Sequence, residues 1–121
     1  MPYLRVSLSQ KLTSEKAEEL YRELSEAFEV LPGKTRDGVV LDLEDAKTMF
    51  LRGVLQENLV FADIHYVGNF AYNLKSKFTE TVFAVFARVL GTKKDEASLT
   101  ITEHQCWGIR GELRDKLYSD V

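Results

Sequence analysis

The stretch LPGKTRDGVVLDLEDAKTMFLRG, residues 31–53, returns in outline as VLGTKKDEASLTITEHQCWGIRG, residues 89–111. Five positions are identical when the two stretches are aligned at one constant shift of 58 residues. The matched pairs are Gly33 with Gly91, Asp37 with Asp95, Leu41 with Leu99, Arg52 with Arg110 and Gly53 with Gly111. A pattern that recurs at a constant shift predicts one structural unit present twice.

The predicted elements come in the same order in both halves. Residues 3–8 alternate apolar and polar side chains, which is typical of a half-buried strand. A helix is predicted from the N-cap candidates Thr13 and Ser14 to the stop at Pro32-Gly33, and GVVLDLE then predicts a strand. In the second half we expect a strand over 60–67, a helix over 73–91 and a strand over 97–102.

Each half is therefore predicted to be a βαβ unit, two parallel strands joined by a right-handed crossover helix. Two such units predict an α+β fold, a four-stranded sheet with both helices on one face. Alternation assigns to the helix-covered face Leu4, Val6, Val39, Leu41, Ala62, Ile64, Leu99 and Ile101, and to the polar face Arg5, Ser7, Asp42, Asp63, His65, Ser98 and Thr100. We expect one domain over residues 1–121, with halves at about 2–53 and 60–111.

Composition restricts the class of protein. A net charge of −3 over 121 residues gives no bulk basic field, so no nucleic-acid partner is expected. The single cysteine excludes an internal disulfide framework and fits a reducing compartment. No basic start precedes an early apolar run, and no stretch approaches the roughly 18 apolar residues of a membrane span. We therefore expect a cytoplasmic protein with no membrane partner.

The amino terminus, MPYLRVSL, places Pro2 at the start of the first predicted strand. Proline is tolerated at that position because the first residue of a strand need not donate a ladder hydrogen bond. Removal of Met1 would also leave Pro2 with a free secondary amine on a rigid strand. The residues of this stretch alone leave both explanations open.

Pro2, the repeat with its seam in mid-chain and the two tails ending in Arg-Gly together resemble the tautomerase superfamily, whose members carry an amino-terminal proline. SEKAEELYRELSEAF and GIRGEL resemble the helix and tail of 4-oxalocrotonate tautomerase, which is one βαβ unit long. The full length, LPGK and DIHYVGN resemble the macrophage migration inhibitory factor branch, where one chain carries both units. The resemblance spans about residues 2–113.

The resemblance implies a role for each matched residue. Pro2 matches the catalytic base, and Lys34 matches the lysine beside it. Val67 matches a residue whose backbone N–H contacts substrate, His65 a histidine that lines the site, and Trp107 an aromatic wall of the pocket. The resemblance further implies a homotrimer whose three sheets enclose a central channel, with active sites at the subunit interfaces.

Two positions depart from the family pattern. Ser98 and Thr100 stand where the migration inhibitory factor branch has a tyrosine and an asparagine that reach the neighbouring subunit's site. Ser98 also replaces a substrate-binding arginine of 4-oxalocrotonate tautomerase. Neither branch's set of partners is complete here, which leaves the identity of the substrate open.

Keto–enol tautomerisation needs a base of near-neutral pKa and a group that stabilises a developing enolate. An α-amino group has an ordinary pKa of about 7.7–8.0, and burial or nearby cations such as Lys34 and Arg36 lower it. The same cations can hold a substrate carboxylate. We therefore expect a cofactor-free tautomerase for a small α-keto or enol carboxylate, similar to phenylpyruvate. His104 and Cys106 lie two apart without a second pair of ligands, so no metal site is predicted.

Two other functions stay open. Superfamily members that hydrate or decarboxylate small acids use protonated proline as an acid and need further arginines near it, for which Arg5, Arg36 and Arg52 are candidates. A catalytically silent binding or structural trimer is the other alternative. A retained Met1 would favour it, because the Pro2 nitrogen would then be an amide.

Structural roles compete with the functional ones. Lys34 follows a helix end, where a cation completes the helix dipole. Arg52 and Arg110 are expected to have a structural role in each tail, such as capping carbonyls or pairing across subunits. The tails, residues 46–53 and 104–111, are predicted to have no strand partner within a closed βαβ pair. We therefore expect them to cover the sheet edge of a neighbouring subunit, which places Trp107 near a subunit boundary.

Overall fold

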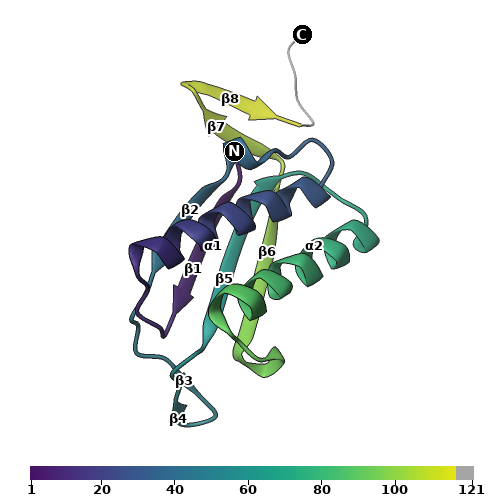
Figure 1. The fold of residues 1–121 in the computed structure, drawn as a ribbon. Helices are drawn as coiled ribbons and strands as arrows, with labels where there is room; N and C mark the ends of the chain where they lie inside the picture. The colour runs from purple at the N-terminus through teal and green to yellow at the C-terminus, as the bar shows by residue number, and fades with distance from the viewer. Residues whose placement is uncertain (117–121) are drawn as a thin grey trace.

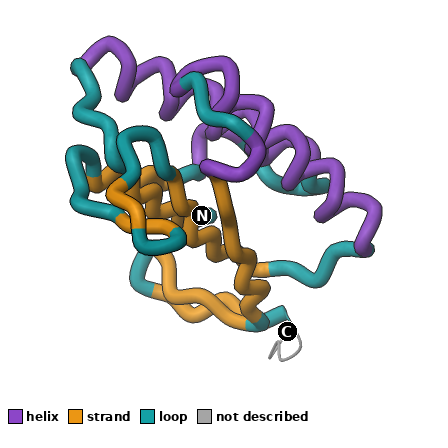
Figure 2. Tube along the Cα trace, turned by 90° about the horizontal axis from the view of Figure 1, so that it is seen from below, coloured by secondary structure: helices purple, strands orange, loops and turns teal. Residues whose placement is uncertain are grey.

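The structure is a computed structural model that describes residues 1–116, and two helices cover one face of its four-stranded sheet (Figures 1 and 2). The main elements are β1 (Tyr3–Leu8), α1 (Ser14–Ala27), β2 (Val40–Glu44), β5 (Val60–Val67), α2 (Tyr72–Val85) and β6 (Ala97–His104). The short elements are η1 (Phe28–Val30), η2 (Arg36–Gly38), β3 (Phe50–Leu51), β4 (Val54–Leu55), η3 (Phe86–Leu90), η4 (Lys94–Glu96), β7 (Cys106–Ile109) and β8 (Glu112–Asp115). This arrangement confirms the predicted α+β fold class.

The sheet has the strand order β2-β1-β5-β6. β1 runs parallel to β2, and β5 runs parallel to β6, as a βαβ unit requires. The two units meet in the centre, where β1 and β5 are antiparallel and Arg5 lies opposite Asp63. The halves are therefore related by an approximate twofold axis between β1 and β5.

The 58-residue shift of the sequence extends to the elements themselves. Helix α1 begins at Ser14 and ends at Ala27, and α2 begins and ends 58 residues later, at Tyr72 and Val85. The helices pack on the sheet through a core that comes from both halves. Its fully buried larger members are Leu4, Val6, Leu8, Leu20, Leu24, Phe28, Leu31, Val60, Ile64, Tyr66, Phe78 and Phe86.

The helix ends differ in detail from the prediction. The Thr13 side chain caps α1 by accepting the backbone N–H of Lys16 at 3.1 Å. The α-helix then stops at Ala27 and tightens into the 3₁₀ turn η1 before Pro32-Gly33 is reached, as is common at helix C-termini. In the second half a π-helical turn, η3, follows α2 and ends at Gly91, whose φ of 71° is left-handed.

Each half ends in a β-hairpin, so each tail has a strand partner in its own chain that lies outside the βαβ unit. Strand β3 pairs with β4, and β7 pairs with β8. Arg52 and Arg110 both have φ of 54°, and the glycines after them have φ of 76° and 77°. Positive φ at both central residues defines a type I′ turn, whose twist matches that of paired strands. The residues after Arg-Gly therefore supply the missing partners.

The first of these hairpins exposes apolar side chains. Phe50, Val54 and Leu55 are 64%, 60% and 56% exposed. Exposed apolar groups on a short hairpin suit contact with another protein surface. That the tails cover the sheet edge of a neighbouring subunit stays a prediction. Within residues 1–116, no helix is long and apolar enough to cross a membrane.

Candidate functional site

The amino terminus lies at one end of the sheet, against the turn η2. Pro2 is buried, and its carbonyl accepts the backbone N–H of Val40 at 2.9 Å. Gly38 is a neighbour of the terminus, since a Cβ there would be in ordinary van der Waals contact with it, 3.9 Å from Pro2 Cδ and 4.0 Å from Met1 Cα. A longer side chain at this position would fill the space around the terminus.

Lys34 approaches the end of β5 from the loop after η1. Its Nζ donates to the carbonyl of Val67 at 2.6 Å and lies 5.5 Å from the centroid of the Tyr66 ring. Burial lowers the pKa of Lys34, and the charge of Lys116 lowers it further. Among residues 1–116 no carboxylate forms an ion pair with Lys34, so its charge is available to an anion.

The N-terminal amine in this structure is that of Met1, and it lies near two cations. Burial lowers its pKa from the ordinary value, and the charges of Lys34 and Arg110 lower it further. The β7–β8 hairpin, which carries Arg110, lies beside the N-terminus (Figure 1). The structure thus places Lys34 in contact with the carbonyl of Val67 and within electrostatic reach of the N-terminus. It adds Arg110, to which sequence reasoning assigned a structural role in the tail.

A hydrogen-bonded network supports this end of the sheet. The carboxylate of Glu103 accepts the Tyr66 hydroxyl at 3.1 Å, the Phe70 backbone N–H at 2.9 Å and the Lys75 ammonium at 3.1 Å. Burial alone would raise the pKa of Glu103, but these three donors outweigh it and lower the pKa. Burial, followed by the bond to Glu103, raises the pKa of Tyr66. The network therefore fixes a neutral phenol beneath Lys34.

His65 lies on the other face of the sheet. Neighbouring residues of a strand point to opposite faces, and Tyr66 is the one packed against the helices. His65 Nε2 is 2.9 Å from Asp63 Oδ1, and its Nδ1 is 2.9 Å from His104 Nε2. The structure thus places His65 away from Lys34, within the polar face that alternation assigned to it.

Trp107 and Arg36 each have partners of their own. The Trp107 ring stands edge-on to His104, with centroids 5.4 Å apart. Arg36 donates to Glu29 at 2.8 and 3.0 Å and to Glu26 at 3.1 Å, at the end of α1. These bonds raise the pKa of Arg36 and lower that of Glu29. The donors of Arg36 are thus directed at its own helix.

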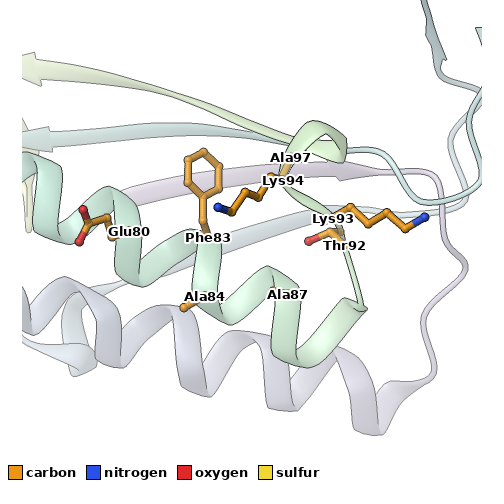
Figure 3. Close-up of a pocket in the computed structure, with 8 residues that line it drawn as sticks. All are labelled: Glu80, Phe83, Ala84, Ala87, Thr92, Lys93, Lys94 and Ala97. Atoms are coloured by element: carbon orange, nitrogen blue, oxygen red, sulfur yellow. The ribbon is translucent and has the colours of Figure 1, made fainter.

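Two cavities of about 500 Å³ differ in their relation to these residues. One, next to Val67, is lined by Gly68, Asn69, Glu103, His104, Gln105 and Lys116. The other is a groove between α2 and the start of β6, lined by Glu80, Phe83, Ala84, Ala87, Thr92, Lys93, Lys94 and Ala97 (Figure 3). None of the predicted site residues lines either cavity, but the first follows Val67 directly at Gly68 and contains Lys116, whose charge acts on Lys34, so it is the better candidate.

The groove has no counterpart in the first half, for a reason visible in the repeat. The positions of Ala84, Ala87 and Lys94 correspond at the 58-residue shift to Glu26, Glu29 and Arg36. The first half fills this space with an ion-paired cluster, whereas the second has two methyl groups and a lysine. Among residues 1–116, no three His, Cys, Asp or Glu side chains are grouped to hold a metal ion.

Comparison with solved structures places this architecture among known proteins. MIF2 from Leishmania major superposes with a TM-score of 0.84 at 18% identity, covering 94% of this chain and 97% of its own. A fused 4-OT, described as a wild-type asymmetric trimer, superposes with 0.80 at 19% identity, covering 95% and 96%. Pt0534 inactivated by 2-oxo-3-pentynoate gives 0.80 at 14% identity, covering 90% and 93%.

The fold is therefore that of the macrophage migration inhibitory factors, and fused 4-OT proteins share it. The neighbours come from both branches that the sequence resembles, so the resemblance is confirmed at the level of the fold. No protein-family model matches the sequence. No curated protein matches it either.

Proposed function

We propose that the chain is a cofactor-free keto–enol tautomerase in which Pro2, freed by removal of Met1, is the general base. The observation that carries the proposal is the setting of the chain terminus: the amine of Met1, one residue before Pro2, is close enough to Lys34 and Arg110 for their charges to lower its pKa. An amine of lowered pKa is neutral, and therefore basic, at neutral pH. The same cations hold a substrate carboxylate in contact with that base.

The reaction moves one proton. The neutral amine of Pro2 takes a proton from the carbon next to the substrate's carbonyl, and the C–H electron pair becomes the double bond of an enolate. The ammonium of Lys34 lies where it stabilises the negative oxygen. Protonated Pro2 gives its proton to that oxygen, directly or through water, which completes the enol and returns the amine to its neutral form; the reverse sequence returns the ketone.

The substrate proposed is a small α-keto or enol carboxylate such as phenylpyruvate. A neighbour in the fold, Pt0534, is inactivated by a 2-oxo acid derivative, 2-oxo-3-pentynoate. In this proposal the backbone N–H of Val67 contacts the substrate and Trp107 forms a wall of the pocket. A homotrimer is proposed as the assembly, in which the exposed apolar hairpin β3–β4 has a surface to cover.

The same electrostatics disfavour the hydratase or decarboxylase alternative. That chemistry needs a protonated proline, and both cations beside the terminus favour the neutral form. A silent trimer is the second candidate, because a retained Met1 turns the Pro2 nitrogen into a non-basic amide. Ser98 and Thr100, in place of the family's partners, also support it.

The deciding experiment combines intact mass with turnover. The purified chain is weighed to establish loss of Met1, and enol–keto conversion of phenylpyruvate is followed for the wild type and for Pro2→Ala. We expect a trimmed wild type whose turnover falls by at least about a hundredfold in the variant. Equal rates would exclude Pro2 as the base, and a uniform mass that includes Met1 would favour the silent trimer.

A further inference from the structure

The groove between α2 and the start of β6 contains none of the residues of the proposed tautomerase site (Figure 3). It measures about 500 Å³, within the range of roughly 300–1,000 Å³ that small-molecule sites have. Phe83, Ala84 and Ala87 line it from α2, and Ala97 lines it from β6. These side chains give the groove a surface against which the apolar part of a ligand can pack.

Lys94 supplies a positive charge to this groove. Figure 3 shows its ammonium directed toward Phe83, whereas the neighbouring Lys93 points the opposite way. The carboxylate among the lining residues is that of Glu80, one turn of α2 before Phe83. Among residues 1–116 neither Glu80 nor any other carboxylate forms an ion pair with Lys94.

The 58-residue shift shows what is missing beside Lys94. Its counterpart in the first half is Arg36, which pairs with Glu26 at 3.1 Å and with Glu29 at 2.8 Å. Alanines occupy both of the corresponding positions in the second half. The second half therefore has the cation without either of its carboxylates, and methyl groups stand in their place.

We propose that the groove binds a small amphiphilic carboxylate from solution, of the class of the medium-chain fatty acids. The ligand's carboxylate takes the place of the missing glutamates beside Lys94, and its alkyl chain covers Phe83 and the alanine methyl groups. Removal of apolar surface from water drives such binding. An extended peptide fits less well, because its backbone N–H and C=O groups need partners that apolar side chains do not offer.

This inference goes beyond the proposed function, and its test needs no turnover. Octanoate is titrated into the full chain, and binding is followed by the NMR signals of the Ala84, Ala87 and Ala97 methyl groups. 1-Octanol has the same chain without the charge, and octyltrimethylammonium has the opposite charge. We expect octanoate to bind about threefold to fivefold more tightly than octanol, the usual effect of one exposed ion pair, and the ammonium compound to bind most weakly. Octanol that binds as tightly as octanoate would overturn the proposal.

Two neighbouring lysines provide a matched pair of variants. Lys94→Met removes the charge that faces the groove and keeps an apolar side chain, and Lys93→Met removes the charge that points away. We expect Lys94→Met to weaken octanoate binding about threefold to fivefold and to leave octanol binding unchanged. Lys93→Met is expected to change neither, and equal effects of the two variants on octanoate would contradict the role of Lys94.

The first half shows how the groove can be filled. Ala84→Glu combined with Ala87→Glu introduces the two glutamates that the first half has at these positions. Both alanines are exposed and glutamate is a good helix former, so the helical circular dichroism should not change. We expect octanoate binding to weaken by at least about tenfold, because the new carboxylates pair with Lys94 and cover the apolar surface. Undiminished binding would show that the ligand lies elsewhere.

Light scattering distinguishes a ligand site from an interface between copies of the chain. Equal molar masses of the wild type and the double glutamate variant, together with octanoate binding by the wild type, support the ligand site. A smaller mass of the variant, or no shift of the alanine signals with octanoate, would overturn it. Because no groove residue belongs to the proposed tautomerase site, failure of either proposal leaves the other standing.

Discussion

The two halves of the chain have the same backbone arrangement. Only one end of the sheet, however, has a terminal amine with cations beside it. At this first end, Gly38 adjoins the chain terminus, and Lys34 and Arg110 stand near its amine. At the second, the position of Gly38 is held by Glu96. The contrast teaches that a repeated scaffold fixes where a site can form, while a few side chains decide whether it does.

The largest effect is expected when Gly38 of the first half is replaced by glutamate, the residue at the equivalent position of the second half. Gly38→Glu adds a side chain in contact with Pro2 and Met1, and its carboxylate raises the pKa of the nearby amine. We expect kcat/KM for the proposed tautomerase to fall on the order of a thousandfold, with unchanged helical circular dichroism. The reciprocal Glu96→Gly is the control, and comparable losses in both variants would refute the assignment of the site to one end.

The next effect concerns Lys34, whose counterpart in the second half is Thr92. Lys34→Thr removes an enolate-stabilising cation, and we expect kcat/KM to fall about a hundredfold. Because this charge lowers the pKa of the amine, its loss raises that pKa. The acidic limb of the pH–rate profile is therefore expected to move to higher pH, since the neutral amine is the base.

An exposed lysine of the second half provides the comparison for that profile. Lys94→Thr removes one positive charge far from the terminus and should leave both the rate and the pH limb unchanged. If the acidic limb of the pH–rate profile of Lys34→Thr stays in place or moves to lower pH, the proposal that Lys34 lowers the pKa of the amine is contradicted.

A third comparison concerns stability. Glu103 accepts the Phe70 backbone N–H, and at the equivalent place Asp45 accepts the Leu12 backbone N–H at 2.8 Å. Only Glu103 also binds the Tyr66 hydroxyl and a lysine. We expect Glu103→Gln to lower the free energy of unfolding by about 2 kcal/mol and Asp45→Asn by about 1 kcal/mol, measured by urea denaturation.

The pH dependence of the Glu103→Gln effect has a definite sign. Folding lowers the pKa of Glu103, so its ionised form stabilises the protein above the pKa of the unfolded chain. That contribution is lost as the pH falls through the lowered pKa of the folded state. The difference between wild type and Glu103→Gln should therefore shrink in acid, and a difference that grows there would show that the carboxylate is not the stabilising form.

The smallest expected effect is on stability, at a position where the two halves have the same residue and the same backbone conformation. Gly53 and Gly111 have nearly the same positive φ, and a Cβ at either meets nothing within 4 Å. Alanine at either position is therefore expected to cost about 1 kcal/mol of unfolding free energy, from backbone strain alone. Thermal or urea unfolding of Gly53→Ala and Gly111→Ala should give equal losses, and a large inequality would mean that the two hairpins are supported differently.

Much of the fold could be predicted because local patterns of apolar and polar residues determine its helices and strands. Alternation located β1 and β5, and helical spacing located both helices, since side chains buried on one face recur at the period of the element. The hairpins were missed because Arg-Gly is not the usual Asn-Gly of a type I′ turn. Only the φ values of Arg52 and Arg110 reveal those turns.

The site was less accessible from the sequence. Pro2 and Lys34 were found by resemblance, because their short motifs survive in the chain. The contributions of Gly38 and Arg110 depend on which loops meet at the end of the sheet, which no local pattern encodes. Comparison of Gly38 with Glu96 at the 58-residue shift was the one available indication, and it acquires meaning only once the N-terminus is seen to lie against Gly38.

The approximate twofold axis between β1 and β5 has a consequence for stoichiometry. The residues that correspond to Met1 and Pro2 are Leu59 and Val60, and the chain runs through them without a break. A polypeptide has one amino terminus, so under the proposed mechanism only one of the two equivalent corners has a base. Three such chains would carry three bases, where six separate units would carry six. The second corner would then take no part in catalysis.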